Sequence, residues 1–391
     1  MAIVKMIDIC EKIGSGATPR GGKEAYCDKG ISLVRSQNVL DFAFSRDGLA
    51  HINDEQAQKL NNVEVHEGDV LLNITGDSVA RACMMDSVFL PARVNQHVAI
   101  VRGKENKVIN SFILYFLQWR KGYLLQLASA GATRNALTKG MIEQLEINLP
   151  SMNEQKKIVA ILDSIQQKIQ LNQKINDNLQ QQALAIFQQE LLRDGEVPEG
   201  WSNGSLLDIA NYLNGLAMQK FRPADGENGL PVLKIKELRQ GSCDASSELC
   251  SPSIKPEYIV HDGDVIFSWS GSLLVDLWCG GTCGLNQHLF KVTSEKYPKW
   301  FYYAWTAHHL ARFVAIAADK ATTMGHIKRE ELAKAEVVIP DAASMERIGG
   351  ILQPMYDLII SNRIENRKLA ALRDTILPQL MSGELDVGDL T

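Results

Sequence analysis

The sequence predicts an α+β protein in which two similar α/β domains are separated by a pair of long antiparallel coiled-coil helices. Three observations carry this expectation: motifs recur at intervals of about 190–195 residues, each repeat ends in a long helical pattern, and a short linker joins the repeats. The expected divisions are a first α/β domain at 1–150, a first spacer helix at 151–193, a second domain at 194–340 with its linker at 194–200, a second spacer helix at 341–383, and a tail at 384–391.

The internal repeat is legible because its motifs keep their order. VHEGDVLLNITG (Val65–Gly76) returns as VHDGDVIFSWSG (Val260–Gly271), and Asn95-Gln96-His97 returns as Asn286-Gln287-His288. In both copies a Gly-Asp turn precedes a β-branched or aromatic run, which predicts a turn followed by a strand. FILYFLQW and its counterpart WFYYAWTA have the spacing of amphipathic helices. Each repeat therefore combines short strands with helices.

The two long helices each have apolar residues at alternating spacings of four and three, which is the seam of a coiled coil. Both seams place two asparagines mid-helix: Asn172 and Asn176 in the first, Asn362 and Asn366 in the second. A buried amide is satisfied only in one alignment, so we expect these residues to fix the helix register, with exposure to solvent as the alternative. Gly349, Gly350 and Pro354 predict a kink or a delayed start of the second helix.

Composition describes an ordinary globular chain, with 45% hydrophobic and 22% charged residues. The seven cysteines lack a disulfide framework and no segment suits a membrane helix, so we expect a cytoplasmic protein. The net charge is −5, but Thr75–Lys139 holds nine Lys/Arg against three Asp/Glu, and Ser268–Arg329 holds seven against three. Such local basic stretches are compatible with phosphate contacts, because these depend on local charge.

The sequence contains no complete catalytic or cofactor-binding motif. GATPRGGKE (Gly16–Glu24) fails the phosphate-loop frame, because Glu24 stands where a hydroxyl should hold Mg²⁺. No dinucleotide-binding glycine motif, nucleophile elbow or base-binding tetrapeptide of amino-methyltransferases is present. Cys279 and Cys283, with Cys243, Cys250 and His288, lack a second tight ligand pair, so we expect buried free cysteines and no metal site. We expect no catalytic residues.

Polar side chains of the types that can contact DNA cluster in the basic stretches and near them. Arg, Asn and Gln can read base edges in pairs of hydrogen bonds, so we treat these residues as candidates for DNA contacts. The candidates are Arg20, Lys23, Arg35, Thr75, Asp77, Ser78, Arg81, Arg93, Gln96, His97, Arg134 and Asn135 in the first repeat, and Lys234, Lys236, Ser270, Ser272, Gln287, His288, Thr322, Thr323, His326 and Lys328 in the second. Asn95 and Asn286, being shared, more plausibly hold a turn. Positions that differ between the repeats are the better candidates for base reading.

These features resemble the specificity subunit of type I restriction-modification systems, over essentially the whole chain. The resemblance rests on SGATP (Ser15–Pro19), on EGDVLL and its copy DGDVIF, on LPSMNEQKKIVAILDSI leading the first long helix, on VPEGW (Val197–Trp201), and on LMSGELDV (Leu380–Val387). Departures occur in the second repeat, which has NGLAMQ in place of SGATP and begins its helix with PDAASMERI. These departures weaken transfer at single residues.

The resemblance implies a non-catalytic adaptor. Each target recognition domain would read one half of a gapped double-stranded DNA site, and the helices would set the gap and dock two methyltransferase subunits. Those partners, and not this chain, would bind S-adenosylmethionine and flip adenine for methylation. Restriction-translocase subunits, with ATP and Mg²⁺, would join for cleavage. The unlike motifs Asn73-Ile74-Thr75 and Ser268-Trp269-Ser270 predict unlike half-sites.

Two other classes of function stay open from the residues. The chain could be the recognition module of a different DNA methylation or restriction enzyme, which would show as partner-free DNA binding with cleavage. It could also be a coiled-coil scaffold whose globular ends bind protein, which predicts no salt-dependent DNA binding.

Overall fold

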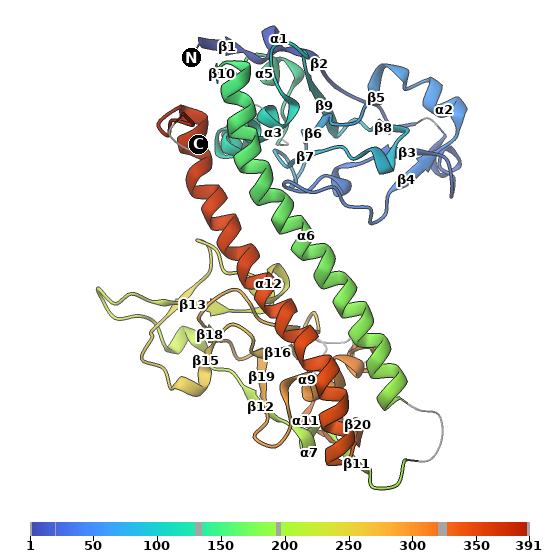
Figure 1. Ribbon diagram of the computed structural model, residues 1–391, viewed down its shortest axis with the longest axis vertical. Coiled ribbons are helices and arrows are strands. Elements are labelled where there is room, and N and C mark those ends of the chain that lie inside the picture. Colours follow the sequence, from blue (N-terminus) through green and yellow to red (C-terminus); the bar gives the residue numbers. More distant parts are fainter. Residues whose placement is uncertain (1, 20, 130–134, 193–196, 320–326, 389–391) are drawn as a thin grey trace. The chain divides into compact units, whose positions relative to one another are not determined.

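The computed structural model describes the chain except residues 1, 20, 130–134, 193–196, 320–326 and 389–391. It divides into two compact units: unit 1 contains 1–167 and 369–391, and unit 2 contains 168–368. These units cut through both long helices, α6 (Met152–Leu191) and α12 (Ala342–Ser382), so each unit holds one α/β domain and a part of each helix. Figure 1 shows both helices as continuous ribbons.

Unit 1 contains two four-stranded sheets and a terminal strand pair. An antiparallel sheet has the order β2-β9-β6-β7, and a mixed sheet has the order β4-β3-β8-β5 with β3 parallel to β8. The strands are β1 (Ala2–Lys5), β2 (Cys10–Ser15), β3 (Ile31–Val34), β4 (Ala50–Ile52), β5 (Glu64–Val65), β6 (Val70–Asn73), β7 (Ala82–Met84), β8 (Ala92–Val94), β9 (Val98–Gly103) and β10 (Glu146–Leu149). The short helices are α1 (Met6–Ile9), α2 (Asp54–Gln58), α3 (Asn110–Trp119), α4 (Lys121–Ser129) and α5 (Lys139–Glu143).

Unit 2 repeats this strand topology. Its sheets have the orders β12-β19-β16-β17 and β14-β13-β18-β15, again with one parallel pair, β13 and β18. The strands are β11 (Ser202–Ser205), β12 (Asn211–Asn214), β13 (Leu230–Leu233), β14 (Leu249–Cys250), β15 (Ile259–Val260), β16 (Val265–Ser268), β17 (Leu274–Leu277), β18 (Cys283–Leu285), β19 (Leu289–Thr293) and β20 (Glu336–Ile339). The helices are α7 (Leu206–Ile209), α8 (Ile235–Gln240), α9 (Lys299–His308), α10 (Leu310–Asp319) and α11 (Arg329–Ala333). The predicted fold class and internal repeat are confirmed.

In each unit the main core lies between the antiparallel sheet, the apolar helix and the long-helix segments. α3 contributes Phe112 to unit 1, and α9 contributes Trp300 at the matching position of unit 2. Both side chains are almost fully buried. The apolar faces of α6 and α12 complete these cores, because a helix of this length cannot bury its own seam.

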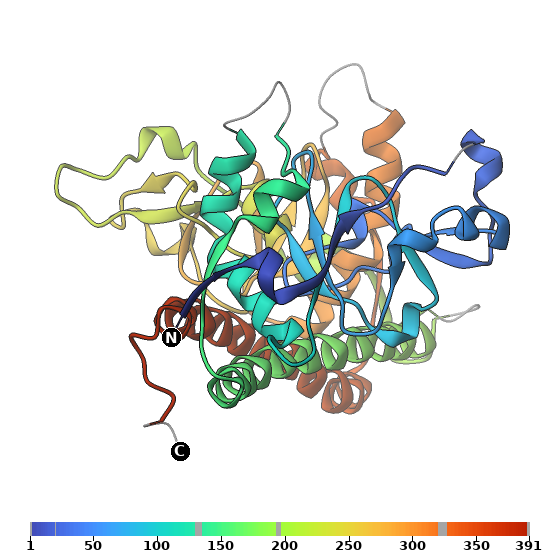
Figure 2. The same cartoon turned by 90° about the horizontal axis from the view of Figure 1, so that it is seen from above.

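The segments of α6 and α12 within each unit pack antiparallel, and both views show them adjacent (Figure 1 and Figure 2). In unit 2, Asn172 Nδ2 donates to Asn366 Oδ1 at 2.9 Å, and Asn362 Nδ2 donates to Asn176 Oδ1 at 2.9 Å. Three of these four asparagines are buried and Asn366 is half-buried. The amides therefore face each other across the seam, not solvent, and meet in one alignment only.

The expectation of a delayed second helix is wrong. α12 begins at Ala342 and continues through Gly349, Gly350 and Pro354. Gly349 has a packing role, since a Cβ there would lie 2.9 Å from Nε1 of the buried Trp300. Burial of Ile348 and Leu352 on either side stabilises this turn against its poor helix propensity.

Candidate nucleic-acid interface

Four loops of unit 1 meet at one end of the strands of the antiparallel sheet. They follow β2, follow β6, connect β8 to β9, and precede α5. Backbone hydrogen bonds join them in sequence: Gly16 N to Asn95 O at 3.1 Å, Ile74 N to His97 O at 3.0 Å, and Gly76 N to Asn135 O at 3.2 Å. Segments far apart in the chain thus form one continuous surface, which we call the four-loop surface of unit 1.

The first of these loops needs a glycine where it meets the third. A Cβ on Gly16 would lie 1.6 Å from Val94 O, and one on Gly215, its counterpart in unit 2, would lie 2.2 Å from Asn286 O. No side chain can be placed in that space. The glycine shared by SGATP and NGLAMQ is therefore explained by close approach of two backbones.

A chain of polar side chains crosses the four-loop surface. Thr75 Oγ1 lies 2.5 Å from His97 Nδ1, and His97 Nε2 lies 2.9 Å from Gln96 Nε2. Gln96 also accepts a hydrogen bond from Thr18. Gln96 is exposed, whereas Thr75 and His97 are half-buried. The amide is thus held at the surface by groups beneath it.

Unit 2 builds an equivalent surface. Trp269 N donates to His288 O at 3.4 Å, and Ile327 N donates to Trp269 O at 3.0 Å. Ser270 Oγ lies 3.1 Å from His288 Nδ1, and Gln287 Nε2 lies 3.3 Å from His288 Nε2. The hydroxyl, imidazole and amide of unit 1 are reproduced atom for atom. No threonine anchors Gln287, because Ala217 stands at the position of Thr18.

The two shared asparagines hold the turn that carries the histidine. Asn95 Oδ1 accepts a hydrogen bond from His97 N at 2.9 Å, and Asn286 Oδ1 accepts one from His288 N at 3.3 Å. Both asparagines are buried. The expectation that they serve the scaffold agrees with this geometry.

The chain matches, over residues 1–181 and 198–372, the family described as the type I restriction modification DNA specificity domain. It belongs to that family. The match falls on both repeats, so this is a specificity subunit with two target recognition domains, and specificity subunits of type I systems are non-catalytic.

Curated relatives and a solved structure agree with this membership. The chain is 24% identical to the type I restriction enzyme MjaIX specificity subunit of Methanocaldococcus jannaschii, over 99% of this chain and 94% of that one. It is 19% identical to the HindI specificity subunit of Haemophilus influenzae, over 91% of this chain and 94% of the relative. The crystal structure of the S subunit from M. genitalium has the same fold, with a TM-score of 0.56 at 12% identity and coverage of 97% and 96%.

The remaining candidates of the specificity subunit distribute unevenly over these surfaces. Exposed candidates are Asp77 and Asn135 in unit 1 and Ser272 and Lys328 in unit 2; Ser78, Arg81 and Gln287 are half-buried, and Ser270 is buried. Arg20, Arg134, Thr322, Thr323 and His326 lie outside the described residues, as does the side chain of Lys23. Their contacts to DNA stay predictions.

Arg93 must be corrected, because its side chain is interior. It lies on β8, only 6% exposed, and pairs with Glu64 at 3.3 Å. Its guanidinium also donates to Ala57 O and to Asn61 Oδ1. Because the Arg93 guanidinium donates its hydrogen bonds inside the domain, it links β5 to α2 and does not reach a base edge.

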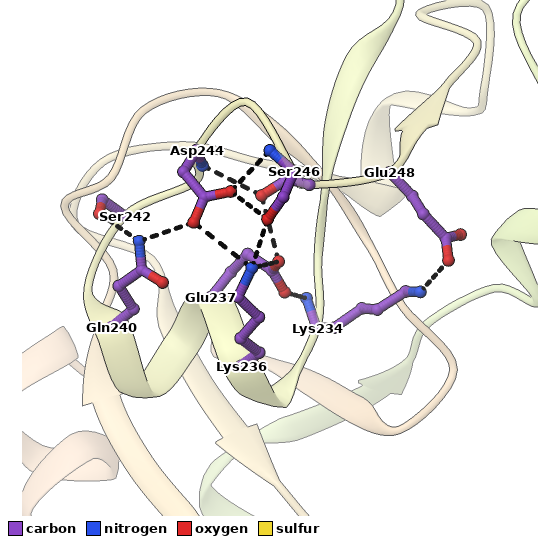
Figure 3. Close-up of polar contacts among 9 residues, drawn as sticks. Lys234, Lys236, Glu237, Gln240, Ser242, Asp244, Ser246 and Glu248 are labelled. Atoms are coloured by element: carbon purple, nitrogen blue, oxygen red, sulfur yellow. Dashed lines mark hydrogen bonds and ion pairs between the residues drawn. The ribbon is translucent and has the colours of Figure 1, made fainter. Parts of the chain in front are cut away.

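Lys234 and Lys236 are already ion-paired, as Figure 3 shows. Lys234 Nζ lies 2.5 Å from Glu248 Oε1, and this hydrogen bond holds the pKa of Glu248 below its ordinary value. Lys236 Nζ lies 2.7 Å from Ser246 Oγ and 3.4 Å from Asp244 Oδ2. A phosphate contact from either lysine would have to compete with these partners, so their DNA role is weakened.

Arg35 occupies the matching position in unit 1 and is likewise engaged. Its guanidinium donates to Gly48 O, across the loop that follows β3. Buried Asn38 donates to Ser45 O and Asp47 O in the same loop. Both units therefore use this position to shape a loop, with backbone carbonyls as the acceptors in unit 1 and carboxylates in unit 2.

Sequence reasoning missed Thr18, Asn214 and Trp269 as members of the surfaces. Thr18 bonds Gln96, and Trp269 Nε1 donates to Asn214 Oδ1 at 3.0 Å while its ring packs against Phe290. Thr18 and Asn214 stand beside the glycine shared by SGATP and NGLAMQ, which was the available signal for these two residues.

Among the residues that the structure describes, no three His, Cys, Asp or Glu side chains gather as metal ligands. Cys250, Cys279 and Cys283 are buried as free thiols, and Cys243 is half-buried. Within the same part of the chain, no helix has the length and apolarity needed to span a membrane.

Proposed function

We propose that this specificity subunit reads a gapped double-stranded DNA site, with one half-site bound at the four-loop surface of each domain. The observation that carries this is the duplication: the same four loops meet in both units and share a scaffold of glycine, asparagine and histidine. The outward residues differ, with Asp77 and Asn135 exposed in unit 1 and Ser272 and Lys328 in unit 2. A shared frame with unlike outward groups suits two readers of unlike half-sites.

The long helices supply the remaining parts of the proposal. Their asparagine pairs fix one alignment, so the gap between the half-sites would have a single length. Exposed apolar residues lie off the seam, including Leu171 and Leu184 on α6 and Leu358 on α12. Such residues suit docking of two methyltransferase subunits, which would bind S-adenosylmethionine and methylate adenine. Restriction-translocase subunits, with ATP and Mg²⁺, would complete a cleaving complex.

The test is methylation mapping after co-expression with the methyltransferase encoded beside this chain. Long-read sequencing of the host DNA reports N6-methyladenine, with the methyltransferase expressed alone as the control. A gapped two-part motif that needs this chain is the expected result, and the two halves should differ. A palindromic motif would refute unlike half-sites. Copurification without any motif, or no copurification, would refute the proposed role, the latter in favour of a protein-binding scaffold.

A further inference from the structure

One arrangement recurs on both four-loop surfaces without serving the turn that carries it. We call it the amide relay: Thr75, His97 and Gln96 in unit 1, and Ser270, His288 and Gln287 in unit 2. The turn itself is already closed by Asn95 or Asn286, whose side chain accepts from the histidine N–H. The glutamine and imidazole side chains are therefore available for a different task.

In each relay, one N–H of the glutamine side-chain amide has no hydrogen-bond partner among the described residues. A glutamine amide carries two N–H donors and one carbonyl acceptor. As oriented, Gln96 uses one N–H toward His97 and its carbonyl toward Thr18. If the amide were turned over, its N–H would bond Thr18 and its carbonyl the imidazole. In either orientation, among the described residues, one N–H of Gln96 points to no partner, and the same holds for Gln287 and its histidine contact.

A free N–H donor at the surface suits a ligand that accepts hydrogen bonds. Gln96 is exposed and Gln287 is half-buried. Arg81 follows the β6 loop in unit 1, and exposed Lys328 follows Ile327 on the surface of unit 2. Among the described residues neither cation has an acidic partner within 4.0 Å, so each is available to a ligand on the surface of its unit. This combination favours an anionic acceptor over a neutral one.

We propose that Gln96 and Gln287 each donate a hydrogen bond to a backbone phosphate of the DNA, at the equivalent place in the two half-sites. His97 and His288, with the hydroxyls of Thr75 and Ser270, are positioning residues that hold the amide. This inference rests on the proposed function. Its central argument is that unlike half-sites share their sugar-phosphate backbone, so a device repeated in both readers is suited to contact that shared part.

The test is ethylation interference on the complex of full-length chain and methyltransferase, with a duplex carrying the methylated motif. Gln96→Ala should abolish interference at one phosphate of one half-site, and Gln287→Ala at the matching phosphate of the other. Each variant should weaken binding about fivefold on the specific duplex and on a shuffled one alike, since one hydrogen bond from an uncharged donor is lost without base discrimination. Gln58→Ala, at an exposed glutamine of α2, is the matched control and should change neither measurement.

A second pair of variants tests the positioning role. Thr75→Val removes the hydroxyl beneath His97 and should reproduce the interference pattern of Gln96→Ala, whereas Thr75→Ser installs the group found in unit 2 and should restore the wild-type pattern. An unchanged phosphate pattern in both glutamine variants, or a changed base preference, would overturn the inference. Methylation of the gapped site by the wild-type complex is measured first. Its loss would refute the proposed function, whereas its presence with unchanged interference refutes the relay contact alone.

Discussion

The two units attach their domains to the long helices by different chemistry, although their topologies match. In unit 2, α12 sends Arg363 to Asp276 at 2.7 Å and Arg367 to Asp262 at 2.8 Å. In unit 1 the attachments are uncharged or aromatic at their domain end: Tyr115 OH donates to Asp163 at 2.7 Å, and the Arg373 guanidinium lies 4.1 Å from the ring centre of Phe42. Equal backbone arrangements thus tolerate unlike contacts, and each unit has its own sensitivity to charge.

The largest expected effect comes from removing the charged attachment of unit 2. The double variant Arg363→Ala with Arg367→Ala removes the charged partners of two partly buried carboxylates, which keep the backbone N–H donors of Gly281 and Leu277, and should lower the stability of unit 2 by about 3–4 kcal/mol. Hydrogen exchange of peptides from β16 and β17 measures it. The control replaces Gln173 and Asp177, the positions of α6 that match by the repeat, and should cost under about 0.5 kcal/mol. Equal losses in both variants would show that the ion pairs of Arg363 and Arg367 do not specifically attach the domain of unit 2 to α12.

The second-largest effect is expected at the interface between α6 and α12, where the two units differ. This interface buries asparagine pairs in unit 2 and apolar residues such as Ile158 and Leu162 in unit 1. Asn176→Leu leaves the buried amide of Asn362 without its acceptor and should cost about 2 kcal/mol. The double variant Asn176→Leu with Asn362→Leu should recover most of that loss, since two apolar groups replace two polar ones. Thermal unfolding measures both, and a double variant less stable than the single one would contradict the amide pairing.

A smaller effect is expected from the neutral attachment of unit 1. Tyr115→Phe removes one hydrogen bond to Asp163 and should cost about 1 kcal/mol, confined to unit 1. Tyr303→Phe is the matched control, because Tyr303 occupies the same place on α9 and no hydrogen bond of its hydroxyl is seen among the described residues; it should cost almost nothing. Denaturant unfolding with exchange detection separates the units, and similar losses in both would argue against this contact.

The smallest expected effect is a different response of the two units to acid, because the pKa values of one carboxylate in each unit are shifted in opposite directions. The hydrogen bond from Arg367 lowers the pKa of Asp262, so its contribution is present above the ordinary carboxyl pKa and is lost as pH falls through the lowered value. Burial raises the pKa of Asp163, so its charged form disfavours folding at neutral pH and protonation relieves this. Between pH 7 and 4, exchange corrected for its intrinsic rate should slow in unit 1 as Asp163 is protonated, whereas exchange in unit 2 should rise only below about pH 4, as Asp262 loses its charge. The opposite trend would assign the pH response to other groups.

Residue patterns identified the repeat, the helices and the members of the four-loop surfaces, but not every direction of a side chain. Arg93 has the residue type and the setting of a base reader, yet β8 turns it inward against Glu64 on the neighbouring strand. A one-residue change of register would have exposed it. Lys234 and Lys236 have the residue type of a phosphate contact, yet both are ion-paired, and their partners come from a loop whose path depends on the buried carboxylate of Glu237.

The sequence by itself determined the duplicated α+β plan, the antiparallel coiled coil with its four asparagines, and the family, because these depend on periodicity and ordered motifs that survive without coordinates. The tertiary structure alone decided which polar residues face outward and which are spent inside. In the folded chain, Thr18, Thr75 and Gln96 meet around His97, and Arg363 and Arg367 pair with their aspartates. Helix α12 continues through Gly349 and Pro354. Such contacts join residues far apart in the chain, and burial and long-range packing, which no local pattern encodes, decide them.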